Sequence, residues 1–255
     1  KTTGTVKTVA DENVRYGSLA NGDFSYPSFS DIQENEQGTY ADLRTFLKSD
    51  DGTLWYNMST TDLSKYGKIG QIPGFDSSRF AWSSTENGSR VELQQDRNTK
   101  NTYAEIVAQQ DNTSIYQNVS TGNGGVLYKI RLKHTSLCKD NVDQMQVVIN
   151  GTPIEMTRVA ANGKAGDKVG EKSKTIGTRV TNENRWHHSD QWETYEGYYV
   201  IPDGQTTTRF GFKAVNYLDP TKGNLLDDVT FARAYKLSYD KNASDATGKV
   251  PSDET

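Results

Sequence analysis

The sequence has few of the residues that mark a disulfide framework, a metal centre or a membrane span. It contains one cysteine, three histidines and six prolines in 255 residues. Cys138 alone cannot form an intrachain disulfide or a cysteine-rich zinc site. His134 lies nearby, but on a strand the two side chains would be roughly 13 Å apart, too far for a nucleophile and its base. No apolar run is long enough to span a bilayer.

Motifs that carry catalysis are missing as well. The chain has no Gly-x-Ser-x-Gly elbow, no His-Glu-x-x-His helix and no phosphate-binding glycine loop. Glycoside hydrolysis needs two carboxylates at a fixed separation, and no phrase marks any of the acids as buried. We therefore expect no enzyme activity and assign no catalytic residue.

Charge of one sign is also scarce. The 29 basic and 33 acidic residues give a net charge of −4, and the basic residues form no stripe that could neutralise phosphates, so nucleic acid is not an expected partner. The hydrophobic fraction is 33% and there are 14 tyrosines. This composition favours a thin β structure with one wet face per sheet over a doubly wound α/β enzyme.

The dominant pattern is an alternation with a period of two. Between residues 125 and 134, apolar Val126, Tyr128, Ile130 and Leu132 alternate with Lys129, Arg131 and Lys133, and Met145, Val147 and Ile149 repeat the pattern. Asn150-Gly151 then predicts a type I′ hairpin turn. Further strands are predicted at 89–94, 102–109, 113–119, 196–202, 206–216, 227–234 and 234–240. The strands predict an all-β jelly-roll β-sandwich of two antiparallel sheets with little helix.

Other segments lack this alternation. Helix is indicated only at 59–67 and at 40–49, residues 50–76 are expected to be an insertion on one edge, and the Gly/Lys-rich 161–177 is expected to be a loop. We expect an N-terminal linker or leading strand at 1–20, a jelly-roll binding domain at 21–240 and a C-terminal linker at 241–255. Because the chain begins with Lys, we expect a monomeric module excised from a larger multidomain protein.

Two phrases resemble a known superfamily. Residues 21–27, NGDFSYP, are similar to the Asn-Gly-x-Phe opening of galactose-binding-like jelly-roll modules, which include many carbohydrate-binding modules. Residues 223–231, GNLLDDVTF, are similar to the Asp-Asp-Val signature of their last strand. The phrases between them resemble a subgroup found in cell-wall-anchored surface proteins of Gram-positive bacteria. The resemblance covers most of residues 21–239.

The resemblance implies that the first and last strands lie close together, often with a structural calcium ion between them. The positions that match the family's metal ligands are Asp23 and Asp228, with Asp227 as a further candidate. Calcium takes about six to eight oxygen ligands, which carboxylates and loop carbonyls supply. Ser25 stands where the family often has an acid. The alternative is that the two C-terminal aspartates only accept hydrogen bonds from turn backbone.

The stretch RWHHSDQW at 185–192 concentrates unusual residues. A transition-metal site is disfavoured, because adjacent histidines on an extended chain point to opposite sides. Aromatic faces stack on sugar rings and anchor protein interfaces. The expected ligand contacts are Arg185, Trp186, His187 and Asp190 here, together with Trp55 and Tyr56 in the long irregular segment. Trp186 and His187 are expected to be exposed, whereas Trp82, Trp192 and Tyr198 are expected to face the core.

These expectations point to a non-catalytic binding module. We expect an adhesin-type module of an extracellular, cell-wall-attached protein that recognises host or environmental glycans. A module that binds a host protein, such as a matrix protein or an immunoglobulin, through a β face or loops is the alternative. A spacer in a surface stalk, with no ligand of its own, is the third possibility, because fold does not determine function.

Overall fold

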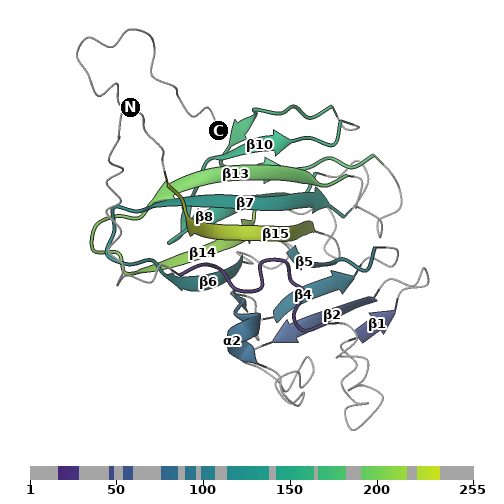
Figure 1. Ribbon diagram of the computed structural model, residues 1–255. Coiled ribbons are helices and arrows are strands. Elements are labelled where there is room, and N and C mark those ends of the chain that lie inside the picture. Colours follow the sequence, from purple (N-terminus) through teal and green to yellow (C-terminus); the bar gives the residue numbers. More distant parts are fainter. Residues whose placement is uncertain are drawn as a thin grey trace, which may run out of the picture.

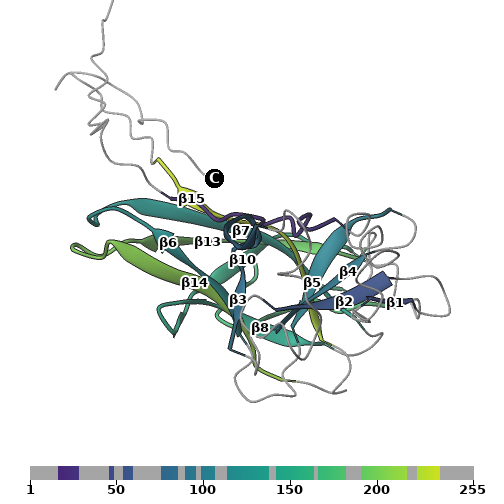
Figure 2. The ribbon, with the colours of Figure 1, turned by 90° about the horizontal axis from the view of Figure 1, so that it is seen from below.

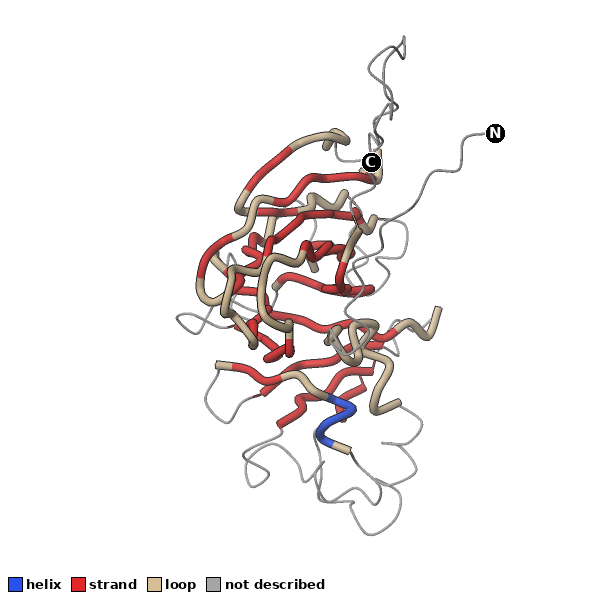
Figure 3. Tube along the Cα trace, turned by 60° about the vertical axis from the view of Figure 1, so that its left-hand side comes forward, coloured by secondary structure: helices blue, strands red, loops and turns tan. Residues whose placement is uncertain are grey.

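The described part of the chain is almost entirely β structure. The computed structural model describes residues 17–28, 46–48, 54–59, 76–85, 90–95, 99–106, 114–137, 142–163, 166–181, 191–216 and 223–235. Within these ranges the strands form two antiparallel sheets, so the expected all-β class with little helix is confirmed. Figure 3 shows the strands in red and one short helix in blue. That helix, α2 (Ser77–Phe80), has four residues, and no described helix is long and apolar enough to cross a membrane.

Nine strands form the larger sheet. From edge to edge they are β1 (Phe46–Lys48), β2 (Leu54–Ser59), β4 (Arg90–Gln95), β5 (Thr102–Ile106), β15 (Asn224–Arg233), β7 (Leu127–Ser136), β13 (Glu193–Val200), β10 (Met156–Ala160) and β11 (Lys172–Ser173). The last described strand, β15, therefore lies near the middle of the sheet, between β5 and β7. Such crossovers fit a jelly-roll sandwich rather than a simple meander.

The smaller sheet lies against the larger one. Its path runs through β12 (Ile176–Gly177), β8 (Gln144–Ile149), β14 (Thr207–Ala214), β6 (Ser114–Ser120) and β3 (Ser83–Ser84), while β9 (Thr152–Pro153) pairs with β8. Figure 1 shows β15, β7 and β13 in front of β14, β6 and β8. Figure 2 shows the same two layers from below. The two inner faces enclose the core, and each sheet keeps one outer face.

The core follows from the alternation along each strand. In β7 the side chains of Tyr128, Ile130 and Leu132 are fully buried, whereas Lys129 and Arg131 on the opposite face reach solvent. Aromatic residues of both sheets fill the space between the layers, among them Trp82, Phe210, Phe212 and Phe231. The predicted core position of Trp82 is therefore confirmed.

One local prediction is also confirmed. Asn150 and Gly151 both have positive φ angles, of 48° and 81°, and they join the paired strands β8 and β9, as the type I′ turn requires. The opening turn lies against the last strand, because the Val229 amide donates to the Gly22 carbonyl at 2.8 Å. Asp228 has a positive φ of 48° at the shift in register of β15, which places Val229 for this bond.

Three segments differ from expectation. Residues 46–48 form a strand where the pattern at 40–49 indicated a helix, and residues 54–59 form a strand inside the supposed insertion. Both extend one edge of the larger sheet, where pairing with β4 outweighs the weak local preference. Within the supposed loop at 161–177, Lys172–Ser173 and Ile176–Gly177 are short strands. Of the predicted helix at 59–67, Ser59 belongs to β2 and the rest lies outside the described residues, as do residues 236–240 of the predicted strand at 234–240.

Candidate functional site

The predicted contact residues fall mostly outside the described part of the chain. Arg185, Trp186, His187 and Asp190 belong to the undescribed residues 182–190. Trp55 and Tyr56 lie in β2 at one end of the larger sheet, and their side chains are not described. The roles of all six residues therefore stay predictions.

The aromatic residues after this stretch separate into two faces. Trp192 is half-buried and contacts Tyr103 edge to face, with ring centroids 5.5 Å apart, so its expected inward position is confirmed. The inward position expected for Tyr198 is wrong, because its side chain is 45% exposed. In β13 the inward positions are Tyr195, Gly197 and Tyr199. A Cβ on Gly197 would lie 2.5 Å from the Met156 sulfur, so Met156 fills the space that a side chain would need.

The predicted calcium ligands already have other partners. The Asp23 carboxylate accepts hydrogen bonds from the amide and hydroxyl of Ser25, and Asp228 forms an ion pair with Lys133 at 2.6 Å. Asp227 accepts hydrogen bonds from Asn101 and from the Asp228 amide. Among the described residues, no three acidic, histidine or cysteine side chains come together as a metal-binding group. The structure does not test calcium binding at these residues, and calcium stays a prediction.

A groove crosses the outer face of the smaller sheet. Three rows of outward-facing residues meet there on β6, β14 and β8, and the register pairs Tyr116 with Gly211 and Gly211 with Val148. We call the nine residues of these rows the outer array: Ser114, Tyr116 and Asn118; Arg209, Gly211 and Lys213; Gln146, Val148 and Asn150. Because the central position has no side chain, a hollow of about 480 Å³ opens between its neighbours.

The floor of the groove needs glycine. A Cβ at Gly211 would lie 2.3 Å from the Ile115 carbonyl oxygen and 2.8 Å from the Tyr116 Cβ, so any larger residue would push β6 away. Thr85 and the Asn150-Gly151 turn complete the lining. The groove is therefore a built feature of the sheet, with an aromatic wall, an aliphatic wall and polar ends.

Arg209 is held in place at one end of the groove. Its guanidinium carbon lies 4.2 Å from the centre of the Tyr116 ring, and its Nε donates to the Asn118 Oδ1 at 3.2 Å. The Arg209 amide donates to the Asn150 Oδ1 at 2.9 Å, which fixes the backbone beneath it. Stacking and one hydrogen bond thus orient the guanidinium, while its two terminal nitrogens make no hydrogen bond to another described residue.

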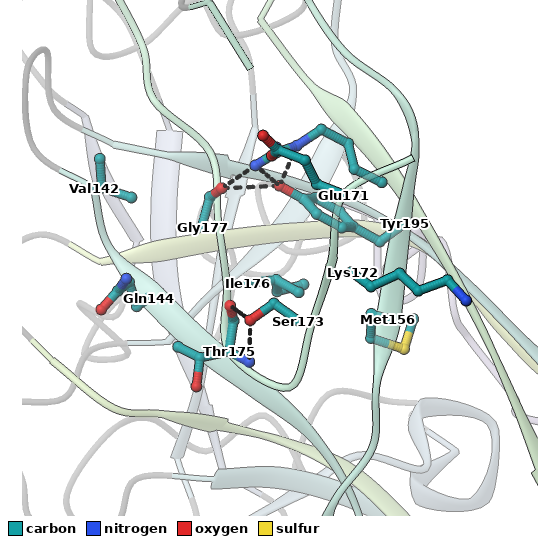
Figure 4. A pocket seen from close by; sticks show the side chains of 11 residues that line it. Val142, Gln144, Met156, Glu171, Lys172, Ser173, Thr175, Ile176, Gly177 and Tyr195 are labelled. Carbon is teal, nitrogen blue, oxygen red and sulfur yellow. Dashed lines mark hydrogen bonds and ion pairs between the residues drawn. The ribbon is translucent and has the colours of Figure 1, made fainter. Parts of the chain in front are cut away.

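A second cavity, of about 370 Å³, lies near the edge where the two sheets approach each other. We call it the Arg158 pocket. Figure 4 shows the Tyr195 hydroxyl and the Gly177 carbonyl joined by a hydrogen bond in its lining, with Glu171 above them. Arg158 lies 2.8 Å from the Glu193 carboxylate, forms an ion pair with Glu171, and donates to the Gly177 carbonyl at 2.9 Å. Its charge is therefore matched by carboxylates.

The network behind this pocket is buried and continuous. The Tyr195 hydroxyl lies within hydrogen-bond distance of Arg158 and Thr178, and Thr178 in turn contacts the Nδ1 of His134 at 2.9 Å. Burial raises the pKa of Glu193 and of Tyr195, although Arg158 opposes both shifts. Burial lowers the pKa of His134 to about 4. With Glu193 fully buried, these groups are suited to joining the sheets rather than to exchanging protons with a substrate.

The residues of the groove were not predicted as a site. Tyr116 and Arg209 fall within predicted strands, and no sequence motif marks either of them as a binding residue. The one available signal was Gly211, because glycine inside a strand often marks a close approach of another backbone or of a ligand.

Comparisons with known proteins give similarity in structure only. No protein-family model matches the chain. No curated protein matches its sequence.

Several solved structures follow a similar path over part of the chain. A xylan-binding domain from Paenibacillus barcinonensis is 12% identical, covers 60% of this chain and 85% of its own, and has a TM-score of 0.34. A family 35 carbohydrate-binding module from Clostridium thermocellum is 12% identical, with coverages of 51% and 76% and a TM-score of 0.30. An enzymatically active domain of a bacteriophage CBA120 tailspike is 8% identical over 86% of this chain and 22% of its own, with a TM-score of 0.34. The chain thus spans under a quarter of that tailspike chain. At these scores no residue's role is taken from these proteins.

Proposed function

We propose that this chain is a non-catalytic glycan-binding module and that the groove over Gly211 is its ligand site. The observation that carries the proposal is the row Tyr116, Gly211 and Val148, in which a missing central side chain leaves a hollow between an aromatic and an aliphatic wall. Sugar rings present apolar C–H faces and a rim of hydroxyls. They are matched by apolar walls with amide and guanidinium groups at the ends.

The polar groups of the groove support the same ligand. Asn118, Asn150 and Arg209 stand beside the hollow, and Ser114 and Thr85 line its other end. Amide and hydroxyl side chains both donate and accept hydrogen bonds, as sugar hydroxyls do. The rigid strands beneath them limit the ordering that binding would require. A single oligosaccharide lying across β6, β14 and β8 would contact all of these groups.

The test compares two tyrosines on opposite faces of the molecule. Wild-type protein is screened on a glycan array, and binding to the best ligand is measured by calorimetry for Tyr116→Ala and Tyr198→Ala. The first change should weaken binding by about 1–2 kcal/mol, or roughly 5- to 30-fold, because it removes a wall of the groove. The second should leave affinity unchanged, because Tyr198 lies on the outer face of the larger sheet. A blank array at high protein density, or equal losses in both variants, would contradict the proposal.

The biological setting belongs to the same proposal. The resemblance to surface modules of Gram-positive bacteria supports an extracellular, cell-wall-attached adhesin that binds host or environmental glycans. In this view Trp55, Tyr56, Arg185, Trp186, His187 and Asp190 add contacts to an extended ligand or form a second site. Alanine variants at Trp186 and Trp55 test this, since a loss of affinity in either would extend the site beyond the groove.

Binding of a host protein is the second candidate function. It is favoured by Tyr198 and Val200, which stand on one face of β13 with exposed fractions of 45% and 59%. Exposed apolar residues of this kind anchor protein interfaces when they form a larger patch. Pull-down from serum with wild type and a Tyr198→Ser/Val200→Ser double variant separates the two functions. Capture of one protein by wild type alone would favour this candidate.

A further inference from the structure

The outer array carries positive charge without a matching acid. Its two charged members, Arg209 and Lys213, stand on β14 on either side of Gly211. All other members are neutral, and neither cation forms an ion pair with another residue that the structure describes. The face of the smaller sheet that holds the groove is thus cationic across its described residues.

Three cations on the outer face of the larger sheet are arranged differently. On the outer face of the larger sheet, Lys129 and Arg131 both pair with Glu196, and Lys133 pairs with Asp228 at 2.6 Å. The whole chain has a net charge of −4, so an excess of basic residues does not account for unpaired cations at the groove. On the outer face of the smaller sheet, by contrast, no described carboxylate pairs with Arg209 or Lys213.

Arg209 is oriented toward an external partner. Stacking on Tyr116 at 4.2 Å and the bond from its Nε to Asn118 hold the guanidinium plane without using the two terminal nitrogens. A guanidinium presents paired N–H groups whose spacing matches the two oxygens of a carboxylate. Since the side chain is already ordered, a bound carboxylate would lose little entropy of the arginine.

Lys213 adds a second cation to the outer array, opposite Ser114, which lines the groove. It lies four residues after Arg209 on the same face of β14, so the two Cα atoms are roughly 13 Å apart. More than one sugar ring is needed to bridge this distance. A single anionic group would meet only one of the cations, whereas an oligosaccharide with repeated acidic units would meet both.

We infer that the groove selects acidic oligosaccharides and that Arg209 binds the carboxylate of a uronic acid. Lys213 attracts a second acidic unit of the same chain. This inference rests on the proposed function and adds the charge class of its ligand. Sulfate esters share the negative charge but not the planar pair of oxygens, so they are the alternative source of an anion at this site.

The experiment uses matched pairs of ligands. Uronate-containing hexasaccharides, their carboxyl-reduced neutral counterparts and sulfated hexasaccharides are titrated into the full chain by calorimetry. At least one uronate should bind about 10-fold or more tightly than its neutral counterpart. Its affinity should fall as sodium chloride rises from about 0.05 to 0.5 M, because salt screens exposed charges. Arg209→Gln should remove most of the preference for the acid, because it should weaken binding of the uronate far more than binding of its neutral counterpart. Lys213→Gln should reduce the preference for the acid about 2- to 5-fold.

The control and the outcomes keep the two proposals distinct. Lys129→Gln removes a cation from the outer face of the larger sheet. It should change neither the affinity for the uronate nor the affinity for its neutral counterpart. Equal binding of acidic and neutral ligands in the wild type would overturn the inference and leave the glycan-binding function standing. A preference for sulfated ligands over uronates would overturn the carboxylate assignment. If the glycan array and all the hexasaccharides give no binding, both proposals fail together.

Discussion

Two arginines each lie beside a tyrosine, and their surroundings assign them opposite tasks. Arg158 lies 5.4 Å from the Tyr195 ring, with its side chain 9% exposed and the carboxylates of Glu193 and Glu171 beside it. Arg209 is exposed and lies 4.2 Å from the Tyr116 ring. Among the described residues, its guanidinium has one hydrogen-bond partner, the amide oxygen of Asn118. The two pairs contain the same residue types, but only Arg158 has its charge matched.

Under the proposed function, matched charge rather than residue type distinguishes the structural Arg158 from the ligand-binding Arg209. A buried cation must be paired, because an isolated charge costs several kcal/mol to bury. An ordered but unmatched cation on a surface makes little difference to stability and leaves binding capacity free. Arg158 is therefore expected to matter for folding and Arg209 for recognition.

Replacing each arginine by methionine should separate these tasks most strongly. Arg158→Met leaves the fully buried Glu193 carboxylate without its cation, so the free energy of unfolding should fall by about 3–5 kcal/mol. Arg209→Met, the matched control, should change it by less than about 0.5 kcal/mol. Urea unfolding followed by fluorescence measures both. Equal losses in the two variants would mean that the contrast between the sites is wrong.

His134, in the network behind Arg158, should make the stability of the protein depend on pH. Burial lowers the pKa of His134 to about 4, whereas the unfolded chain has the ordinary value of about 6.5. Between these values the unfolded state binds the extra proton, so stability is complete above about pH 6.5 and is lost as the pH falls toward 4. The difference of about 2.5 units corresponds to roughly 3 kcal/mol.

This measurement needs a reference, because Asp227 acts in the opposite direction. Burial raises the pKa of Asp227 to about 7, which lowers stability as the pH rises from about 4 to 7. The His134 contribution is therefore taken as the difference between wild type and His134→Gln across this range. NMR titration of the His134 ring should show it neutral at pH 6. A ring that titrates near 6.5 would contradict the prediction. Among the described residues, the groove lining contains no histidine or carboxylate, so affinity for a neutral glycan should stay constant from about pH 5 to 8.

Removing the hydroxyl of Tyr195 or of Tyr116 should give a smaller difference in stability than the arginine substitutions do. The Tyr195 hydroxyl contacts Thr178, Arg158 and the Gly177 carbonyl within 2.9–3.2 Å. Tyr195→Phe leaves buried polar partners unsatisfied and should lower the free energy of unfolding by about 1–3 kcal/mol. Tyr116→Phe should leave it unchanged, because the wall of the groove is the ring itself. Thermal unfolding of both variants at pH 7 measures the difference, and a loss in Tyr116→Phe alone would reverse the assignment.

Local patterns explain how much of the fold could be predicted. Alternation along 126–132 and the Asn150-Gly151 turn are properties of adjacent residues, and both predict the structure correctly. Tyr198 shows the limit of such patterns. Its inward position is predicted from its place in the strand approaching Ile201, but the register with β10 gives the inward position to Gly197, where Met156 fills the space. Which face of a strand is buried depends on its neighbours and not only on its own residues.

The groove and the Arg158 pocket depend on pairing between distant strands. Tyr116, Gly211 and Val148 form a row only through the register of β6, β14 and β8. Glu171 and Gly177 lie in a segment whose composition predicted a loop, and their contacts with Arg158 order it. Neither site has a sequence motif of its own. The sequence predicts ligand contacts in the segment 185–192 because of its unusual composition, and these contacts remain a separate hypothesis.

The predicted calcium site applies the same reasoning to an acidic residue instead of a basic one. Asp228 is paired with Lys133, so calcium would have to displace an ammonium group. A weak site with a Kd of about 0.1–1 mM would stabilise the protein by about 0.4–1.4 kcal/mol at 1 mM calcium. If calcium binds there, chelator-treated protein should give heat and a higher Tm on titration. Lys133→Gln should strengthen this response, because the competing cation is gone, and Asp228→Asn should abolish it. Absence of heat and of any Tm change in both the wild type and Lys133→Gln would mean that Asp228 serves only as the partner of Lys133.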